Sequence, residues 1–121
     1  AFEEEREFII IPYEEDSTYV FLQSAKTPEL AFLMTMPLTF FPDYEFTIDD
    51  EVEAELGLTS PDEVLIYTIL TLSGTEIRDL TANLMAPIVI NTTTRKAKQI
   101  VLERSAYTTK HRLFSAEKED R

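Results

Sequence analysis

The chain has 121 residues, of which 44% are hydrophobic, and it carries a formal charge of −12 at pH 7 and no cysteine. This length suits one domain with an ordinary core, and the lack of cysteine excludes disulfides and thiolate chemistry. No apolar run approaches the roughly 20 residues that span a bilayer, so no membrane segment is expected.

Strands are predicted through most of the first half of the chain. The apolar runs Glu7–Ile11 and Tyr19–Ser24 predict two strands joined by a charged turn. A third strand is predicted from Leu30 to Met36, because Pro37 follows and stops it. Apolar and polar residues then alternate over residues 44–48, which predicts a short strand with one buried face.

Helix signals are confined to residues 49–63. Asp49 or Asp50 can cap a helix that ends at Leu56, and Gly57 supplies a left-handed C-terminal stop. Residues 60–63 read Ser-Pro-Asp-Glu, a capping box with proline in the first turn, which predicts one more short helical turn.

The second half predicts the longest strand and a hairpin. Val64–Leu72 is the longest β run, and Ile77–Leu80 leads into the hairpin. The two arms of the hairpin are the apolar runs Leu84–Ile90 and Ile100–Leu102, on either side of a polar link. Pro87 lacks an N–H group, so it should lie at a bulge or at an edge position.

These elements predict a mainly β fold with about seven strands and one or two short helices. Helices between strands are missing, so the sheet should be antiparallel and close into a compact barrel-like domain over residues 1–114. Residues 115–121 are expected to form a charged, disordered tail. Runs such as Phe8–Ile11 are apolar at successive positions, so we expect exposed apolar surface that serves a protein partner or a dimer.

The charge is divided unevenly along the chain. Residues 1–94 hold 3 basic and 19 acidic groups, whereas residues 95–121 hold 8 basic and 4 acidic groups. Such an acidic surface should repel nucleic-acid phosphates, and it either attracts basic proteins or only keeps the chain soluble. The basic cluster Arg95, Lys96 and Lys98 has no interleaved aromatic residue, which favours a soluble hairpin tip over a nucleic-acid site.

No catalytic or metal-binding motif is present. His111 is the only histidine, so no His cluster and no Cys–His pair exists, and a structural or surface role is favoured. The carboxylates Asp43 and Glu45, like the acidic run of residues 49–55, fit a solvated face better than an acid–base pair or a Ca²⁺ loop. We therefore expect no cofactor, no metal and no enzymatic activity. The alternative is a small β-barrel enzyme or ligand-binding protein with an acidic pocket.

Aromatic side chains beside carboxylates favour a binding site for a basic protein. The candidate partner-binding residues lie in an aromatic segment and on the predicted helix: Phe40, Phe41, Asp43, Tyr44, Glu45, Glu51, Glu53 and Glu55. The alternative for the aromatic rings is that they fill the interior of the barrel.

Several motifs in fixed order give the chain a resemblance to a known family. They are Phe2 to Phe8, Pro28 to Phe32, Phe41 to Phe46, Leu56 to Leu58 with Ser60 to Glu63, Thr81 to Asn91 with Gln99, and Tyr107 with His111. Through them the chain resembles the flagellar assembly factor FliW family from Phe2 to Phe114. The motif positions that serve either the fold or the function are Thr81, Ala82, Asn83, Leu84, Pro87, Asn91 and Gln99.

Two departures from the family pattern concern the start of the chain. Members usually begin with a further β segment, which the 1–114 domain is expected to lack, and they commonly have Gly where this chain has Ala1. Within the motif, Asn83 is predicted to be buried at a turn or bulge with its amide hydrogen-bonded to the backbone. Asn83→Leu would then lower the free energy of unfolding by roughly 1–3 kcal/mol.

The resemblance implies a cytoplasmic, protein-binding regulator of flagellar assembly. Its implied partners are flagellin and the RNA-binding translational repressor CsrA, with no direct binding to nucleic acid or membrane. By binding CsrA, such a protein relieves repression of flagellin mRNA translation. The acidic charge agrees with this role, because a bound acidic protein disfavours RNA phosphates nearby.

Overall fold

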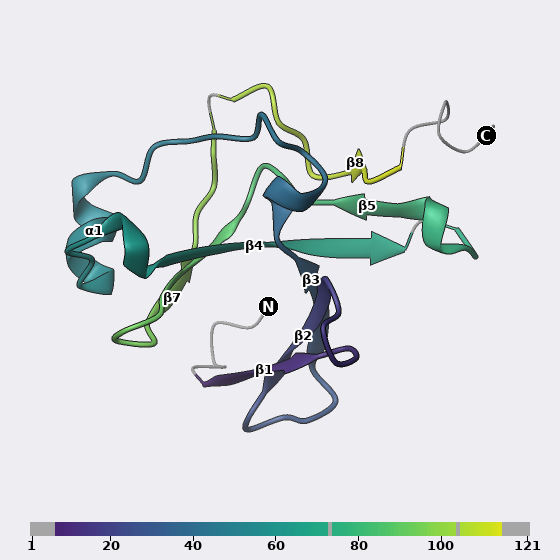
Figure 1. Cartoon of the computed structure of the whole chain (residues 1–121), viewed down its shortest axis with the longest axis horizontal. Helices are drawn as coiled ribbons and strands as arrows, with labels where there is room; N and C mark the ends of the chain where they lie inside the picture. The colour runs from purple at the N-terminus through teal and green to yellow at the C-terminus, as the bar shows by residue number, and fades with distance from the viewer. Residues whose placement is uncertain (1–6, 73, 104, 115–121) are drawn as a thin grey trace.

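The computed structural model describes residues 7–72, 74–103 and 105–114, which form a mainly antiparallel β fold with one α-helix (Figure 1). The strands are β1 Phe8–Pro12, β2 Tyr19–Ser24, β3 Ala31–Thr35, β4 Val64–Leu72, β5 Leu80–Ala82, β6 Ile88–Asn91, β7 Ala97–Gln99 and β8 His111–Arg112. The helix is α1 Asp50–Leu56, and three 3₁₀ turns span Pro37–Thr39 (η1), Pro61–Glu63 (η2) and Ile77–Asp79 (η3). The predicted fold class is confirmed, although the sheet does not close into a barrel.

The long strand β4 joins the two parts of the sheet. Its first half pairs with β6, in the register Val64↔Asn91, and its second half pairs with β5, in the register Leu70↔Ala82. β3 pairs with the middle of β4, and β2 and β1 follow in order. β7 adds to β6, so among the described strands β1 has only β2 as a neighbour and β7 has only β6.

The two faces of β6 pack against different parts of the molecule, because side chains alternate along a strand. Val89 is fully buried against Val52 and Leu56, which are the apolar positions of α1. Ile88 and Ile90 face the other way and pack with the β2–β4 residues Val20, Met34 and Tyr67. A third cluster includes Tyr44, Leu80, Leu84 and Leu113.

The predicted ends of the helical segments are confirmed. Asp49 Oδ1 accepts a hydrogen bond from the Val52 N–H at 2.9 Å, and Gly57 ends α1 with φ of 69°, in the left-handed region. Ser60 and Glu63 form the capping box of η2. Hydrogen bonds from the Thr59 N–H and hydroxyl to Glu63 lower the pKa of this carboxyl from its ordinary value.

Two predicted strands differ from the structure. Residues 44–48 alternate in burial as expected, yet they form no ladder, so the strand predicted there is wrong. The second hairpin arm is the polar β7 rather than Ile100–Leu102. The tip fixes this register, since the Asn91 N–H donates to the Lys96 carbonyl at 2.8 Å and Arg95 turns with φ of 65°. The motif residues Phe2 to Arg6 and the tail 115–121 lie outside the described residues.

Candidate protein-binding surface

The aromatic segment of residues 40–46 lies against the C-terminal part of the fold. Tyr44 is buried, and its hydroxyl donates a hydrogen bond to the Leu84 carbonyl at 2.7 Å. Its ring meets that of Tyr107 at a centroid distance of 4.6 Å, and burial raises the pKa of Tyr44. The Tyr107 hydroxyl accepts a hydrogen bond from the Glu45 N–H and donates one to the Glu45 carbonyl. Tyr44 therefore fills the interior, as the alternative for the aromatic rings supposed.

Phe40 and Phe41 are only half-buried. Phe40 contacts Phe114 edge-on at 5.7 Å, and Phe41 contacts the ring of His111 at 6.0 Å. The His111 ring also faces Tyr107 at 6.1 Å, and its buried Nε2 has no hydrogen-bond partner among the described residues. His111 thus serves as a packing residue here, and Phe40 and Phe41 keep part of their rings open to solvent.

Removal of the Tyr44 hydroxyl tests how firmly this segment is anchored. Tyr44→Phe keeps the ring and leaves the buried Leu84 carbonyl without its donor, so we expect the free energy of unfolding to fall by about 1–2 kcal/mol. Urea unfolding measures the change, with the same slope of free energy against urea concentration used for each variant. Tyr13→Phe is the matched control, because Tyr13 is an exposed residue, and it should cost less than about 0.5 kcal/mol. Equal losses in the two variants would contradict the anchoring role.

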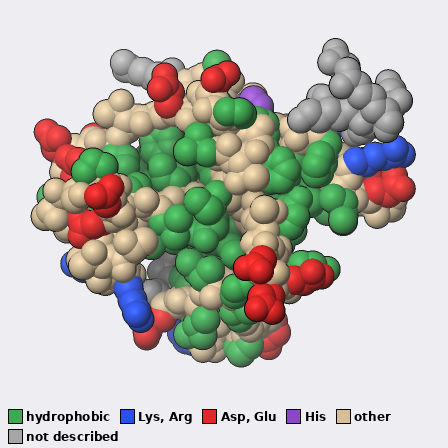
Figure 2. Space-filling view, in the orientation of Figure 1, with side chains coloured by type: hydrophobic (Ala, Val, Ile, Leu, Met, Phe, Trp, Pro, Cys, Tyr) green, Lys and Arg blue, Asp and Glu red, His purple; other side chains and the backbone are tan. Residues whose placement is uncertain are grey.

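The predicted acidic residues face solvent. Asp43 and Glu45 flank Tyr44, and Glu51, Glu53 and Glu55 are exposed on α1. Acidic side chains are visible around α1 at the left of Figure 2. Glu55 alone among the five forms a described ion pair, with Lys98 Nζ at 2.9 Å, and this hydrogen bond raises the pKa of Lys98. The remaining four carboxylates are available to a basic partner.

Large apolar side chains are exposed at several places on the surface, which confirms the expected exposed apolar surface. The exposed large apolar residues are Ile9, Ile10, Ile11, Tyr13, Met36, Leu38, Leu72, Ile77 and Val101. Figure 2 shows apolar side chains over much of one face. Met36 is the N-cap of η1 and Leu38 is its second residue, and Phe40 and Phe41 follow shortly after, so these four residues form one apolar stretch of the chain, followed by Asp43. We call the exposed and half-buried residues Met36, Leu38, Phe40, Phe41, Asp43 and Glu45 the η1 surface.

Most family-motif positions are buried within the fold. Thr81, Ala82, Leu84, Pro87 and Asn91 are buried. The Asn91 side chain bonds the Leu56 carbonyl and the N–H groups of Thr93 and Thr94. Gln99 is exposed, and its Nε2 donates to the Ala86 carbonyl at 3.2 Å. Pro87 lies immediately before β6, at the interruption between β5 and β6, where a missing N–H group costs nothing to the ladder.

The prediction that the side-chain amide of Asn83 is hydrogen-bonded to the backbone is wrong for its oxygen, Oδ1. Oδ1 is buried and accepts no hydrogen bond from any described residue. Only the backbone is bonded: the Asn83 N–H donates to Ile69 and its carbonyl accepts from Thr68 Oγ1 at 2.8 Å. Asn83→Leu removes an unsatisfied polar group, so we now expect the free energy of unfolding to stay level or rise, as measured in urea. A loss above about 1 kcal/mol would show that the amide stabilises the fold.

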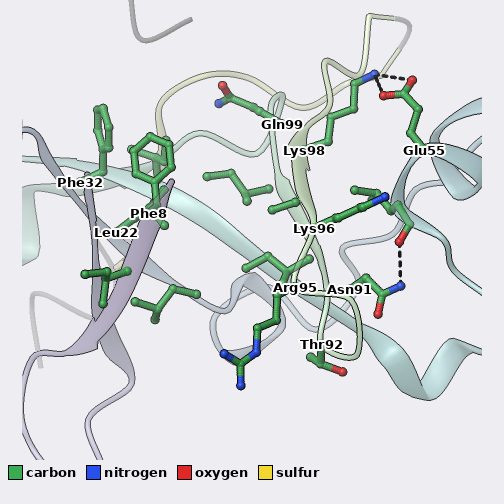
Figure 3. A pocket seen from close by; sticks show the side chains of 17 residues that line it. Phe8, Leu22, Phe32, Glu55, Asn91, Thr92, Arg95, Lys96, Lys98 and Gln99 are labelled. Carbon is green, nitrogen blue, oxygen red and sulfur yellow. Dashed lines mark hydrogen bonds and ion pairs between the residues drawn. The ribbon is translucent and has the colours of Figure 1, made fainter. Parts of the chain in front are cut away.

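The described residues include no group of three His, Cys, Asp or Glu side chains that could hold a metal ion. Their helices include none long and apolar enough to cross a membrane. Among the described residues, a large groove between β1 and β7 (Figure 3) is lined mainly by apolar and basic side chains, with Glu55 as the carboxylate in that part of the lining. This groove therefore does not match the acidic pocket of the alternative hypothesis.

A family model described as "FliW protein" matches residues 1–113. The chain belongs to the FliW family. It is 41% identical over 114 residues to a protein of Moorella thermoacetica named "Flagellar assembly factor FliW", covering 94% of this chain and 72% of that protein. The protein of the same name from Bacillus subtilis is 44% identical over 111 residues, which cover 92% of this chain and 77% of that protein.

The fold agrees with that of a solved FliW structure. The structure titled "Crystal structure of the flagellar assembly factor FliW" superposes with a TM-score of 0.90 at 40% identity. The match covers 97% of this chain and 81% of the solved chain. FliW proteins are flagellar assembly factors, and the β scaffold described above is the one that presents the exposed carboxylates and the η1 surface.

Proposed function

We propose that this chain is a cytoplasmic protein-binding regulator that binds flagellin and the translational repressor CsrA, and that it relieves repression of flagellin mRNA translation. The observation that supports the proposal is the combination of exposed apolar residues and unpaired carboxylates on the η1 surface of a FliW-family protein. An apolar centre with a charged border is the usual composition of a protein-binding site.

The two partners need not bind at separate places. A single surface that binds flagellin and CsrA in turn couples the level of free flagellin to the release of the repressor. By linkage, each partner then weakens binding of the other by the same factor. The proposal therefore requires competition between the two, measured with purified proteins.

The test is a titration of the chain with labelled CsrA, followed by addition of flagellin. We expect saturable binding of CsrA and its displacement by flagellin. Leu38→Asp places a charge at the exposed apolar centre of the η1 surface and should weaken binding at least about tenfold. Ile77→Asp is the matched control, since Ile77 is also exposed but lies in η3, beside β5.

The control should bind as the unaltered chain does. Equal loss of affinity in both variants would remove the η1 surface from the proposal. Failure of the unaltered chain to bind either protein would overturn the proposal itself.

A further inference from the structure

The three methionines of the chain differ sharply in their exposure to solvent. Met36 is 42% exposed, Met85 is half-buried, and Met34 is fully buried in the cluster that β2, β4 and β6 share. The chain has no cysteine and no tryptophan, so these thioether sulfurs are the groups that a mild peroxide oxidises first. Because oxidation also requires access of the oxidant to sulfur, Met36 is the expected site of reaction.

The residues on either side of Met36 fix its side chain on the outside. Thr35 is fully buried, and its Oγ1 donates a hydrogen bond to the Thr18 carbonyl at 2.6 Å. Pro37 is buried as well. Met36 itself has an extended backbone, with φ of −80° and ψ of 117°, and side chains alternate in direction along such a backbone. Since both neighbours point inward, the Met36 side chain projects into solvent.

The fold uses the backbone of Met36 rather than its side chain. The Met36 carbonyl accepts a hydrogen bond from the Thr39 N–H at 3.1 Å and so begins η1. Among the described residues, Met36 belongs to none of the three apolar clusters of the core. A chemical change at its sulfur should therefore alter the surface and leave the stability of the fold nearly unchanged.

The surface that this change would alter is the η1 surface. Met36 and Leu38 are its most exposed apolar residues, at 42% and 54%, and Phe40 and Phe41 are half-buried beside them in sequence. Conversion of a thioether to a sulfoxide turns a flexible apolar side chain into a polar one. An apolar binding surface pays for such a group, because its oxygen must lose water when a partner docks.

We propose that Met36 is an oxidation site through which hydrogen peroxide regulates the η1 surface. The sulfur lone pair attacks one peroxide oxygen, the S–O bond forms as the O–O bond breaks, and the other oxygen leaves as water. Sulfur loses two electrons in this step. A methionine sulfoxide reductase reverses it, because two thiols are oxidised to a disulfide and the sulfoxide oxygen leaves as water. The site itself is independent of the proposed function, whereas its regulatory effect on partner binding rests on it.

The site is tested by the order in which the methionines react. The folded chain is treated with hydrogen peroxide, and tandem mass spectrometry follows each methionine with time. We expect Met36 to be oxidised at least tenfold faster than Met34 and several-fold faster than Met85. In urea that unfolds the chain, the three rates should become similar, because the fold sets the order. Equal rates in the folded chain, or fastest reaction at Met85, would overturn the site.

The regulatory effect is tested by binding of labelled CsrA before and after treatment, with the peroxide destroyed before CsrA is added. Oxidation should weaken binding to the unaltered chain at least about fivefold, and a pair of reductases, one for each sulfoxide epimer, should restore it with dithiothreitol. Met36→Leu removes the sulfur, so treatment should not change its affinity. Met85→Leu is the matched control, and its affinity should fall on treatment as that of the unaltered chain does.

A third variant and a stability measurement separate a surface effect from damage to the fold. Met36→Gln carries a polar side chain that peroxide does not oxidise, and it should bind CsrA at least about fivefold more weakly than the unaltered chain without treatment. The melting temperature of the chain oxidised at Met36 should stay within a few degrees of that of the reduced chain. A large fall in melting temperature would overturn regulation through the η1 surface.

Two results distinguish failure of this inference from failure of the proposed function. If the reduced chain binds CsrA and Met36→Leu loses affinity on treatment as much as the unaltered chain does, regulation by Met36 is overturned and the proposed function stands. If the reduced chain binds neither CsrA nor flagellin, the proposed function is overturned together with its regulation. The order of oxidation rates decides the site in either case.

Discussion

Asn91→Ala is expected to lower the free energy of unfolding by about 3 kcal/mol. The side chain is fully buried and makes three hydrogen bonds: Nδ2 donates to the Leu56 carbonyl at 2.8 Å, and Oδ1 accepts from Thr93 and Thr94 at 2.8 and 3.2 Å. Each such bond contributes about 1 kcal/mol net, and the two N–H groups lose their acceptor when Oδ1 is removed. Asn91 ties the hairpin tip to the end of α1, so both should loosen together.

Urea unfolding measures this loss, and Gln99→Ala is its control. Gln99 is also a family-motif amide, but it is exposed and its side chain donates one hydrogen bond, to the Ala86 carbonyl, so its removal should cost less than about 1 kcal/mol. Hydrogen exchange should also speed up at Thr93, Thr94 and Gly57 in the Asn91 variant. A loss below about 1 kcal/mol for Asn91→Ala would mean that the hairpin tip is held by Thr94, whose Oγ1 also donates to Leu56.

Local signals in the sequence predicted the elements whose stability is local. The caps of α1, the left-handed Gly57 and the capping box of η2 each depend on neighbours within four residues, and all three are present. β4 was predicted at its observed bounds, because nine consecutive residues without a turn signal leave little choice.

The predictions failed where distant residues decide the structure. β7 reads Ala-Lys-Gln and carries no apolar pattern, and it becomes a strand because Ile88–Asn91 needs a partner across a tip set by Arg95. Residues 44–48 have the strand pattern but no neighbour to pair with. The burial of Tyr44 depends on Leu84, 40 positions away. The candidate site divides in the same way: exposed carboxylates were predictable, whereas the groove between β1 and β7 depends on the whole topology.

Charge reversal on α1 is expected to uncouple CsrA binding from RNA release. Within the proposed function, an acidic regulator can either occupy the RNA site as a phosphate mimic or bind elsewhere and act through its field. A mimic needs carboxylates in a rigid row, but α1 is seven residues long and has 3.6 residues per turn, so Glu53 points away from Glu51 and Glu55. The exposed apolar residues of the η1 surface favour docking with charge at the border.

We therefore expect Glu51→Lys, Glu53→Lys and Glu55→Lys together to leave CsrA bound at moderate salt. The factor by which the chain weakens RNA binding should fall about tenfold, and the difference should shrink as salt rises. The control carries the same change of charge at Glu14, Glu15 and Glu29, which are exposed on the turns after β1 and β2. Because the control changes the total charge equally, a loss confined to the α1 variant would show that the position of the carboxylates matters.

The measurement is equilibrium binding of CsrA to the chain, with and without saturating RNA. Linkage supplies an internal check, since RNA must weaken binding of the chain to CsrA by the same factor in each variant. If the α1 variant loses CsrA binding altogether, or if RNA and the unaltered chain exclude each other completely at saturation, the carboxylates occupy the RNA site directly. Direct occupation of the RNA site by the α1 carboxylates would then be the mechanism, in place of an electrostatic field that acts from another site. The main binding site for CsrA would be α1 rather than the η1 surface.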